Sequence, residues 1–122
     1  MTDAEAKRRL ELTLAQAGNT HSIADLVTML EEQRARLFHY RDGYVVAEIN
    51  RYPRLSAVNY WLIWGALKDC LALEHEVGPW AIEQGCTVAT AMGRPGWLRA
   101  AGPTGWRLHG YAYGKELVHG RR

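Results

Sequence analysis

Two stretches of the chain carry residues whose types and spacing could do chemistry. In the first, an apolar run ends at Gly65 and a helical pattern begins at once, with Lys68 in its first turn. The first backbone N–H groups of a helix have no partner within it, so they can bind an anion, and a lysine there can touch a phosphate. The alternative, a solvated helix residue, is the more common role for a lysine at such a position. The junction of strand and helix is therefore one candidate ligand site.

The second stretch covers residues 93–106, where glycine, arginine and tryptophan concentrate. Arg94 and Arg99 flank Trp97, and Arg107 follows. Guanidinium groups suit phosphates and carboxylates because they donate paired hydrogen bonds. The alternative is plain surface charge beside a packed tryptophan. We predict a partner or anion contact at these four residues.

The remaining reactive side chains lack a motif. Cys70 and Cys86 have neither metal-ligand spacing nor a disulfide framework, so we interpret them as reduced, packed thiols of a cytosolic protein. No histidine has a motif-like relation to Cys86, which argues against a thiol nucleophile. The five histidines show no ligand spacing, so we expect no metal site.

Length and composition indicate one ordinary globular domain of 122 residues, with 48% apolar and 23% charged residues. No apolar run approaches the ~20 residues of a membrane helix, and the polar N-terminus does not resemble a signal peptide. The net charge of +2 hides an asymmetry: residues 1–50 carry six Lys/Arg and eight Asp/Glu, whereas residues 87–122 carry six and one. The basic C-terminal third is either a solvated face or a surface for phosphate, nucleic acid or an acidic protein.

Two helices are predicted at the N-terminus. Residues 4–17 have a helical composition and could form an arm that docks loosely or pairs with a neighbouring subunit. A second helix follows Ser22, which makes a capping box with Asp25, and it should fade around residues 32–33.

A hairpin and a central strand come next. Residues 36–41 and 44–49 alternate in polarity around Asp42-Gly43, and both turn residues tolerate a positive φ. Residues 57–64 are nearly all apolar, which is typical of a central strand covered on both faces.

The rest of the chain predicts a crossover helix and further strands. A helix over residues 66–84 should kink or split near Gly78-Pro79, because proline lacks the N–H and its ring clashes with the preceding turn. Two strands separated by a crossover helix are parallel. The further expected elements are a strand at 86–92, a short helix at 96–101 and a fifth strand at 107–113.

Several short motifs follow one another in a characteristic order. They are Val46-Ala47-Glu48-Ile49, Tyr52-Pro53-Arg54, Trp61-Leu62-Ile63-Trp64-Gly65, Leu73-Glu74, Trp80-Ala81, Gly85-Cys86, Gly93-Arg94-Pro95-Gly96-Trp97-Leu98-Arg99-Ala100 and Gly105-Trp106. Together they resemble the GNAT (Gcn5-related N-acetyltransferase) fold, and more closely the small GNAT-like proteins of tailed phages. The resemblance covers about residues 20 to 113.

The resemblance implies an α/β (α+β) fold with a mixed sheet. Antiparallel hairpin strands come first, a βαβ crossover follows, and helices cover both faces. We divide the chain into an N-terminal helical arm (1–19), a GNAT-like domain (20–114) and a basic C-terminal tail (115–122).

The resemblance also implies where a cofactor would bind. In GNAT enzymes the loop after the splayed strand wraps the pyrophosphate of acetyl-CoA. The corresponding residues are Trp64, Gly65, Ala66, Leu67 and Lys68, and they are our candidate cofactor-binding residues. The leading Arg/Gln and the first glycine of the usual pattern are missing, and the loop is short.

A catalytic residue is harder to carry over. Glu48 lies on a strand where some GNAT enzymes keep a general base, although a surface or salt-bridged carboxylate is the alternative. Tyr111 and Tyr113 do not have the spacing of the tyrosine that acts as acid in many GNAT enzymes. Trp97 is closest to that position, but an indole N–H is a very poor acid.

Two hypotheses follow. In the first, a phage-encoded, catalytically degenerate GNAT-like protein acts as a virion-associated or assembly component. Its partners would be phage structural proteins or further copies of itself, with nucleic acid as a weaker option for the basic third. It would lie in the host cytoplasm or in the virion. In the second, the chain is an acetyl-CoA-dependent N-acetyltransferase with a non-standard cofactor loop.

Overall fold

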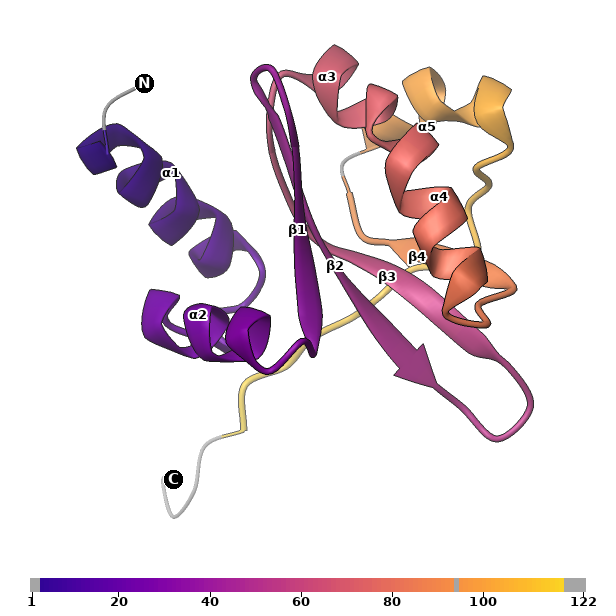
Figure 1. Ribbon diagram of the computed structural model, residues 1–122, viewed down its shortest axis with the longest axis horizontal. Helices are drawn as coiled ribbons and strands as arrows, with labels where there is room; N and C mark the ends of the chain where they lie inside the picture. The colour runs from indigo at the N-terminus through magenta and orange to yellow at the C-terminus, as the bar shows by residue number, and fades with distance from the viewer. Residues whose placement is uncertain (1–2, 94, 118–122) are drawn as a thin grey trace.

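A computed structural model describes residues 3–93 and 95–117. The predicted contact residue Arg94 and the end of the predicted basic tail lie outside these residues. The elements in chain order (Figure 1) are α1 (Asp3–Gln16), α2 (Ile23–Glu31), β1 (Ala35–Tyr40), β2 (Gly43–Arg51), β3 (Ser56–Gly65), α3 (Leu67–Ala72), α4 (Glu74–Glu83), β4 (Val88–Ala91), α5 (Pro95–Ala101) and the 3₁₀ helix η1 (Gly102–Thr104).

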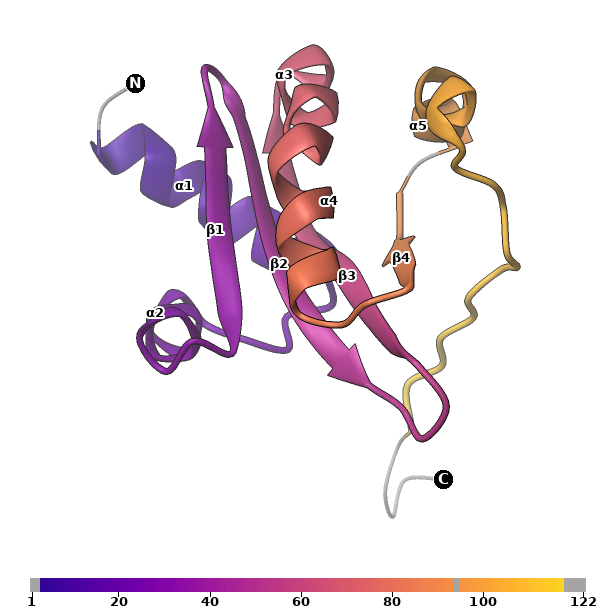
Figure 2. The ribbon, with the colours of Figure 1, turned by 45° about the vertical axis from the view of Figure 1, so that its right-hand side comes forward.

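The four strands form one mixed sheet in the order β1-β2-β3-β4. The first three strands are antiparallel neighbours, and β4 joins β3 in parallel after the α3–α4 crossover. α1 and α2 lie on one side of the sheet, and α3 and α4 lie on the other (Figures 1 and 2). The predicted fold class, with its hairpin strands, βαβ crossover and helices on both faces, is confirmed.

The crossover helices cover one face of the sheet. Leu73 and Val77 are fully buried against Val45, Ala47 and Val58 of the central strands. Burying each large aliphatic side chain stabilises the fold by about 1.5–3 kcal/mol. This core fixes the crossover against the strands that frame the candidate ligand site.

The N-terminal helices cover the other face. Leu14 of α1 and Leu26 and Met29 of α2 pack with Val46 and Leu62 of the central strands. In this chain α1 lies against β3 rather than projecting away from the sheet. The division into an arm and a domain at residue 19 stays a prediction.

The capping box at the start of α2 is confirmed. Ser22 Oγ accepts the Asp25 N–H at 3.1 Å, and Asp25 Oδ2 accepts the Ser22 N–H at 2.8 Å. Hydrogen bonding of the Asp25 carboxyl group to the Ser22 backbone, and then to the Ser22 side chain, lowers the pKa of that carboxyl group.

The predicted hairpin is present, but its turn is shifted by one residue. The two turn residues are Arg41, which has a φ of 51°, and Asp42, while Gly43 already belongs to β2. Asp42 and Gly43, which would tolerate a positive φ, do not adopt one. Gly43 is required for another reason: a Cβ atom there would lie 2.6 Å from the backbone of Asp69 and Cys70 in α3. A side chain at this position would push the crossover helix away from the hairpin.

The predicted kink at Gly78-Pro79 is also wrong in position. The crossover breaks at Leu73, whose carbonyl accepts hydrogen bonds from both Glu76 N–H and Val77 N–H at 2.9 Å. A new helix, α4, starts after this tight turn. Pro79 then falls in the second turn of α4, where its missing N–H removes only one hydrogen bond.

The predicted fifth strand is absent from the described residues. The chain after η1 runs past β4 and forms no ladder with it (Figure 2). Trp106 packs over Tyr60 on the face of β3, with ring centroids 5.3 Å apart, so the segment starts above the sheet rather than in its plane. An alternating sequence forms a strand only when its backbone lies in the plane of a sheet and pairs with a neighbouring strand, and residues 107–113 do not pair with β4 of this chain. The short helix is confirmed as α5, and β4 is shorter than predicted.

Candidate ligand site between strands β3 and β4

The parallel strands β3 and β4 separate partway along the sheet. Their pairing covers only four residue pairs, from Ala57–Val88 to Tyr60–Ala91, and β3 then continues alone over residues 61–65. The separation begins at a β-bulge, because Val46 pairs with Leu62 but Ala47 pairs with Tyr60. Trp61 is therefore an extra residue in β3, and such bulges bend a strand away from its neighbour. The candidate ligand site is the opening between β3 and β4 and the start of α3.

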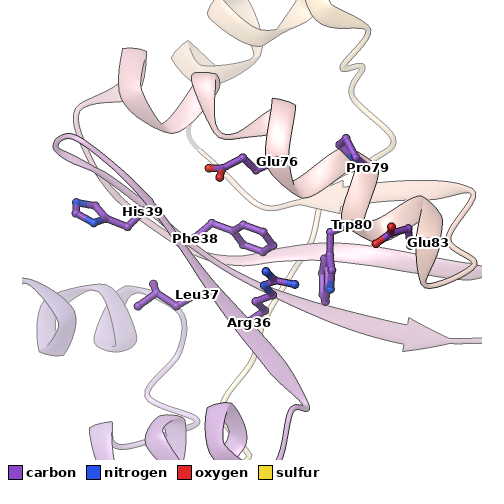
Figure 3. Close-up of a pocket in the computed structure, with 8 residues that line it drawn as sticks. All are labelled: Arg36, Leu37, Phe38, His39, Glu76, Pro79, Trp80 and Glu83. Carbon is purple, nitrogen blue, oxygen red and sulfur yellow. The ribbon is translucent and has the colours of Figure 1, made fainter.

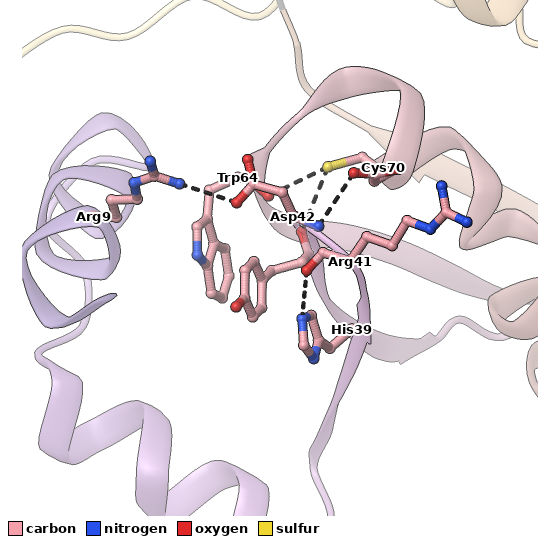
Figure 4. A network of polar contacts seen from close by, with 8 residues as sticks. Arg9, His39, Arg41, Asp42, Trp64 and Cys70 are labelled. Carbon is pink, nitrogen blue, oxygen red and sulfur yellow. Dashed lines mark hydrogen bonds and ion pairs between the residues drawn. The ribbon is translucent and has the colours of Figure 1, made fainter. Parts of the chain in front are cut away.

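The start of α3 is covered by the hairpin turn of the same chain (Figure 4). The carbonyl oxygen of Asp42 accepts the Ala66 N–H at 2.7 Å, and the Asp42 N–H donates to Asp69 Oδ2 at 3.1 Å. Gly65 has a φ of 101°, and a Cβ atom there would collide with the Asp42 carbonyl. Backbone that would have to approach a phosphate instead lies against the turn.

The charges at this junction oppose an anion. Asp69 lies in the first turn of α3, where a carboxylate interacts favourably with the helix dipole. The Asp42 carboxylate lies nearby and accepts a 3.3 Å hydrogen bond from Arg9 Nη1 of α1. Lys68 is exposed. With one N–H already bonded and two carboxylates in place, these residues do not fit a pyrophosphate.

Trp64 points away from the helix start. Its ring stacks on Tyr44 with centroids 5.0 Å apart, Tyr44 stacks on His39 with centroids 4.3 Å apart, and the rings of each pair are nearly parallel. The row crosses three strands on the face that carries α1. Trp64 is thus a packing residue of the sheet here.

Cys70 closes the junction from inside. Its thiol is buried and donates to the Trp64 carbonyl at 3.3 Å. Burial raises the pKa of the Cys70 thiol, and a neutral thiol is a weak nucleophile. This agrees with the interpretation of both cysteines as packed thiols.

Glu48 belongs to a polar row that crosses the sheet. Thr90 Oγ1 donates to Asn59 Oδ1 at 3.0 Å, and Asn59 Nδ2 donates to Glu48 Oε1 at 3.0 Å. The half-buried Glu48 also borders a hollow of about 390 Å³ at the end of the sheet, next to Ala35 and Gln84. The row joins β2, β3 and β4. The Glu48 carboxylate therefore has a structural role as the hydrogen-bond acceptor of Asn59, and this role does not depend on general-base catalysis.

Tyr60 is a titratable group at the start of the opening, because it forms the last residue pair between β3 and β4. It is buried under Trp106, and burial, followed by the nearby Glu74 carboxylate, raises its pKa well above its usual range. A tyrosine with a raised pKa is a worse proton donor to a leaving thiolate, because an ordinary thiol such as that of cysteine has a pKa of only about 8.5. The burial that anchors the C-terminal chain therefore works against acid catalysis.

The predicted contact residues near the C-terminus lie on α5 and on the chain that follows η1. Trp97 is half-buried in α5 against Gly93, whereas Arg99 and Arg107 are exposed. Within the described chain, neither arginine side chain makes an ion pair or a hydrogen bond. Arg94 cannot be placed, so the four-residue contact stays a prediction.

One hollow was missed by sequence reasoning. It has a volume of about 400 Å³ and lies between β1 and α4 (Figure 3). The Arg36 guanidinium carbon lies 5.2 Å from the Phe38 ring centroid and 5.7 Å from that of Trp80, and Glu76 and Glu83 line the side formed by α4. Alternation of Arg36 and Phe38 on an edge strand was the available signal. The hollow is at the opposite edge of the sheet from the β3–β4 opening.

The described residues contain neither a metal-ligand cluster nor a membrane-spanning helix. Across 3–93 and 95–117, no three His, Cys, Asp or Glu side chains are grouped as metal ligands would be. No helix in the same ranges is long and apolar enough to cross a membrane.

Comparison with known proteins supports the fold. The Thermus thermophilus protein TTHA1254 matches in a point-mutant structure (16% identity, TM-score 0.64, 98% of this chain and 96% of that one) and in the wild type (19%, 0.59, 99% and 96%). An acetyltransferase of Trypanosoma brucei matches at 12% identity with a TM-score of 0.62, over 95% of this chain and 96% of that one. No protein-family model and no curated protein matches the sequence. The chain has a GNAT-like fold, and identities this low show the fold alone.

Proposed function

We propose that this GNAT-fold chain does not transfer acetyl groups and instead works through contacts with other macromolecules. The observation that carries the proposal is the closed start of α3. Its Ala66 N–H is bonded to the Asp42 carbonyl, and Asp69 occupies the place where an anion would interact with the helix. A pyrophosphate would have to displace the hairpin turn before it could bind.

The proton-transfer groups support the same proposal. The raised pKa of Tyr60 disfavours proton donation, and the Glu48 carboxylate is held by Asn59. The exposed arginines 99 and 107 and the exposed tyrosines 111 and 113 form a C-terminal region suited to contacts. Contact function therefore requires no rearrangement of the described chain.

We further propose that the partners are phage structural proteins or other copies of this chain. On this proposal the protein is phage-encoded, resides in the host cytoplasm and is incorporated into virions or helps to assemble them. The support is the resemblance of the short motifs to GNAT-like phage proteins. The expected result is that mass spectrometry of purified virions detects the chain. Finding it only in host fractions, unbound to any virion component, would contradict the virion role.

Calorimetry with acetyl-CoA tests the main proposal. We expect no saturable heat and no upward shift of the melting temperature at millimolar cofactor. The test is sensitive, because a ligand at a thousand times its dissociation constant stabilises a protein by about 4 kcal/mol. Micromolar, saturable binding would overturn the proposal.

A pair of charge variants locates any binding that is seen. Lys68→Glu reverses a charge at the start of α3, and Lys7→Glu makes the same change on the exposed surface of α1. If acetyl-CoA binds at the junction, Lys68→Glu should weaken it far more than Lys7→Glu does. Equal, small effects in both variants would assign the heat to nonspecific charge attraction.

The second candidate function is an acetyl-CoA-dependent N-acetyltransferase with a non-standard cofactor loop. The observation that favours it is the opening between β3 and β4 with its bulge at Trp61. Acetylation of an amine by the purified chain, lost in the Glu48→Gln variant, would favour it over the contact proposal.

A further inference from the structure

The two edges of the sheet differ in how they are protected against pairing with another chain. The edge strand β1 contains Arg36 and is flanked by Arg34 and Arg41, and charged side chains on an edge disfavour further pairing. The other edge strand, β4, has the sequence Val-Ala-Thr-Ala and carries neither charge nor proline. β4 therefore presents an unprotected edge.

The outer edge of β4 has no partner in the described chain. β4 pairs only with β3, and its side chains are small and mostly exposed. Its outward N–H and C=O groups are a template for one more strand. The preceding residue, Thr87, donates its N–H to the carbonyl of Ser56, the first residue of β3, at 3.0 Å, so the start of β4 is held against β3.

The segment over residues 107–113 has the complementary properties. Its sequence alternates as a strand does, yet no hydrogen bond in the described chain involves residues 106–117. Leu108, Tyr111 and Tyr113 are 57%, 77% and 92% exposed. Unpaired backbone beside large exposed apolar side chains is typical of a segment that is covered by a partner.

The position of Trp106 indicates whether residues 107–113 pair with β4 of the same copy or with β4 of another copy. Because Trp106 is fixed on the face of β3 over Tyr60, the following residues leave from above the sheet and run past β4 without pairing (Figure 2). The same chain supplies both an unpaired strand and an unpaired edge. Two copies can satisfy both by a reciprocal exchange, which closes as a symmetric dimer.

We propose that residues 107–113 of one copy add to the outer edge of β4 of a second copy as a fifth strand. This rests on the proposed contact function and names its partner as the chain itself. Tyr111 and Tyr113 of each copy would then lie beside the β4 edge of the other, next to the opening between β3 and β4.

The oligomeric state and a proline variant test the exchange. We expect light scattering of the full chain at micromolar concentrations to give twice the 13.8 kDa mass of one copy. Tyr111→Pro should weaken dimerisation by at least about tenfold, because proline removes a ladder donor. Glu116→Pro places the same change beyond the strand and should leave the dimer intact. A monomeric wild type, or a Tyr111→Pro dimer, would overturn the inference.

Cysteine pairs identify whose strand pairs with whose edge. We expect a disulfide between copies when an Ala89→Cys chain is mixed with a His109→Cys chain, while Cys70 and Cys86 are buried in both. A chain with both changes that cross-links only within one copy would overturn the exchange, because the segment would then pair with its own β4. A monomer that binds no acetyl-CoA would sink the exchange and leave the proposed function standing. A dimer that binds acetyl-CoA would instead contradict the proposed function and leave the strand exchange standing.

Discussion

The junction around Gly65 and the segment after Trp106 differ in whether their polar groups have partners. At the junction, the turn carbonyl of Asp42 bonds to Ala66 and the Asp69 carboxylate bonds to the Asp42 amide. After Trp106, no hydrogen bond involves the described residues up to 117. The junction that was predicted to bind a cofactor is therefore occupied by the hairpin turn of the same chain. The segment after Trp106, in contrast, has unpaired polar groups.

This difference separates fold from function in the chain. The β3–β4 opening and the crossover helix follow from packing that a GNAT-like fold requires. Whether an anion can bind at the start of α3 depends instead on Asp42 of the hairpin turn and on Ala66 and Asp69 at the start of the helix. The same architecture can therefore be kept while its ligand site is closed.

The largest expected effect comes from breaking the closed junction at Gly65. Gly65→Ala puts a side chain at a positive φ and against the Asp42 carbonyl, and it should lower the free energy of unfolding by about 3 kcal/mol. Urea denaturation measures the loss. Gly114→Ala, where no atom lies within 4 Å, should change stability by less than about 0.5 kcal/mol. Equal effects at the two glycines would show that the turn does not press on Gly65.

The sequence predicted the framework well because the framework depends on local patterns. The Ser22 cap, the apolar β3 and the crossover could be predicted because each follows from the spacing of capping or apolar residues within a short stretch of sequence. The role of Gly43 did not, because it is set by the approach of α3, which is distant in sequence. The break at Leu73 and the unpaired segment at 107–113 depend likewise on packing that local patterns do not contain.

The candidate site was predicted only in outline. Sequence reasoning located the residues from Trp64 to Lys68 and noted that glycine and arginine were missing. It could not foresee that Asp42, more than twenty residues earlier, bonds across the helix start. Sequence reasoning also included Trp64 among the cofactor-binding residues. In the structure the Trp64 ring stacks on Tyr44, on the face of the sheet that is opposite to the crossover helices. Side-chain direction at the end of a bulged strand is set by the bulge.

The next largest effect concerns the anchor of the open segment. Trp106→Ala removes a half-buried ring from Tyr60 and should cost about 2 kcal/mol in the free energy of unfolding. Arg107→Ala, at an exposed neighbour whose side chain makes no ion pair or hydrogen bond in the described chain, should cost less than about 0.5 kcal/mol. Chemical denaturation of both variants measures the difference. If they matched, Trp106 would not be an anchor.

A smaller effect should follow from weakening the turn at its carboxylate. Asp69→Asn exchanges a charged acceptor for a neutral one opposite the Asp42 N–H, and we expect a loss of about 1 kcal/mol. The matched control is Glu76→Gln, an acid in the first turn of α4. Thermal denaturation compares the two. Equal losses would assign the effect of Asp69 to the helix dipole and not to the turn.

The smallest expected effect is a pH dependence at Tyr60. Its folded-state pKa is raised above the usual value near 10, so its contribution to stability is complete below pH 10 and is lost as the pH rises further. The melting temperature of the wild type should therefore fall more steeply above pH 10 than that of Tyr60→Phe. Parallel pH profiles would contradict the burial of the Tyr60 hydroxyl group.

The most direct test of the closed junction is the amide resonance of Ala66 in a titration with coenzyme A. We expect this N–H to exchange slowly with solvent, because it donates to the Asp42 carbonyl, and to keep its chemical shift at millimolar coenzyme A. A shift that saturates at micromolar ligand, and that disappears in Lys68→Glu but not in Lys7→Glu, would contradict the closed junction and restore the start of α3 as a cofactor site.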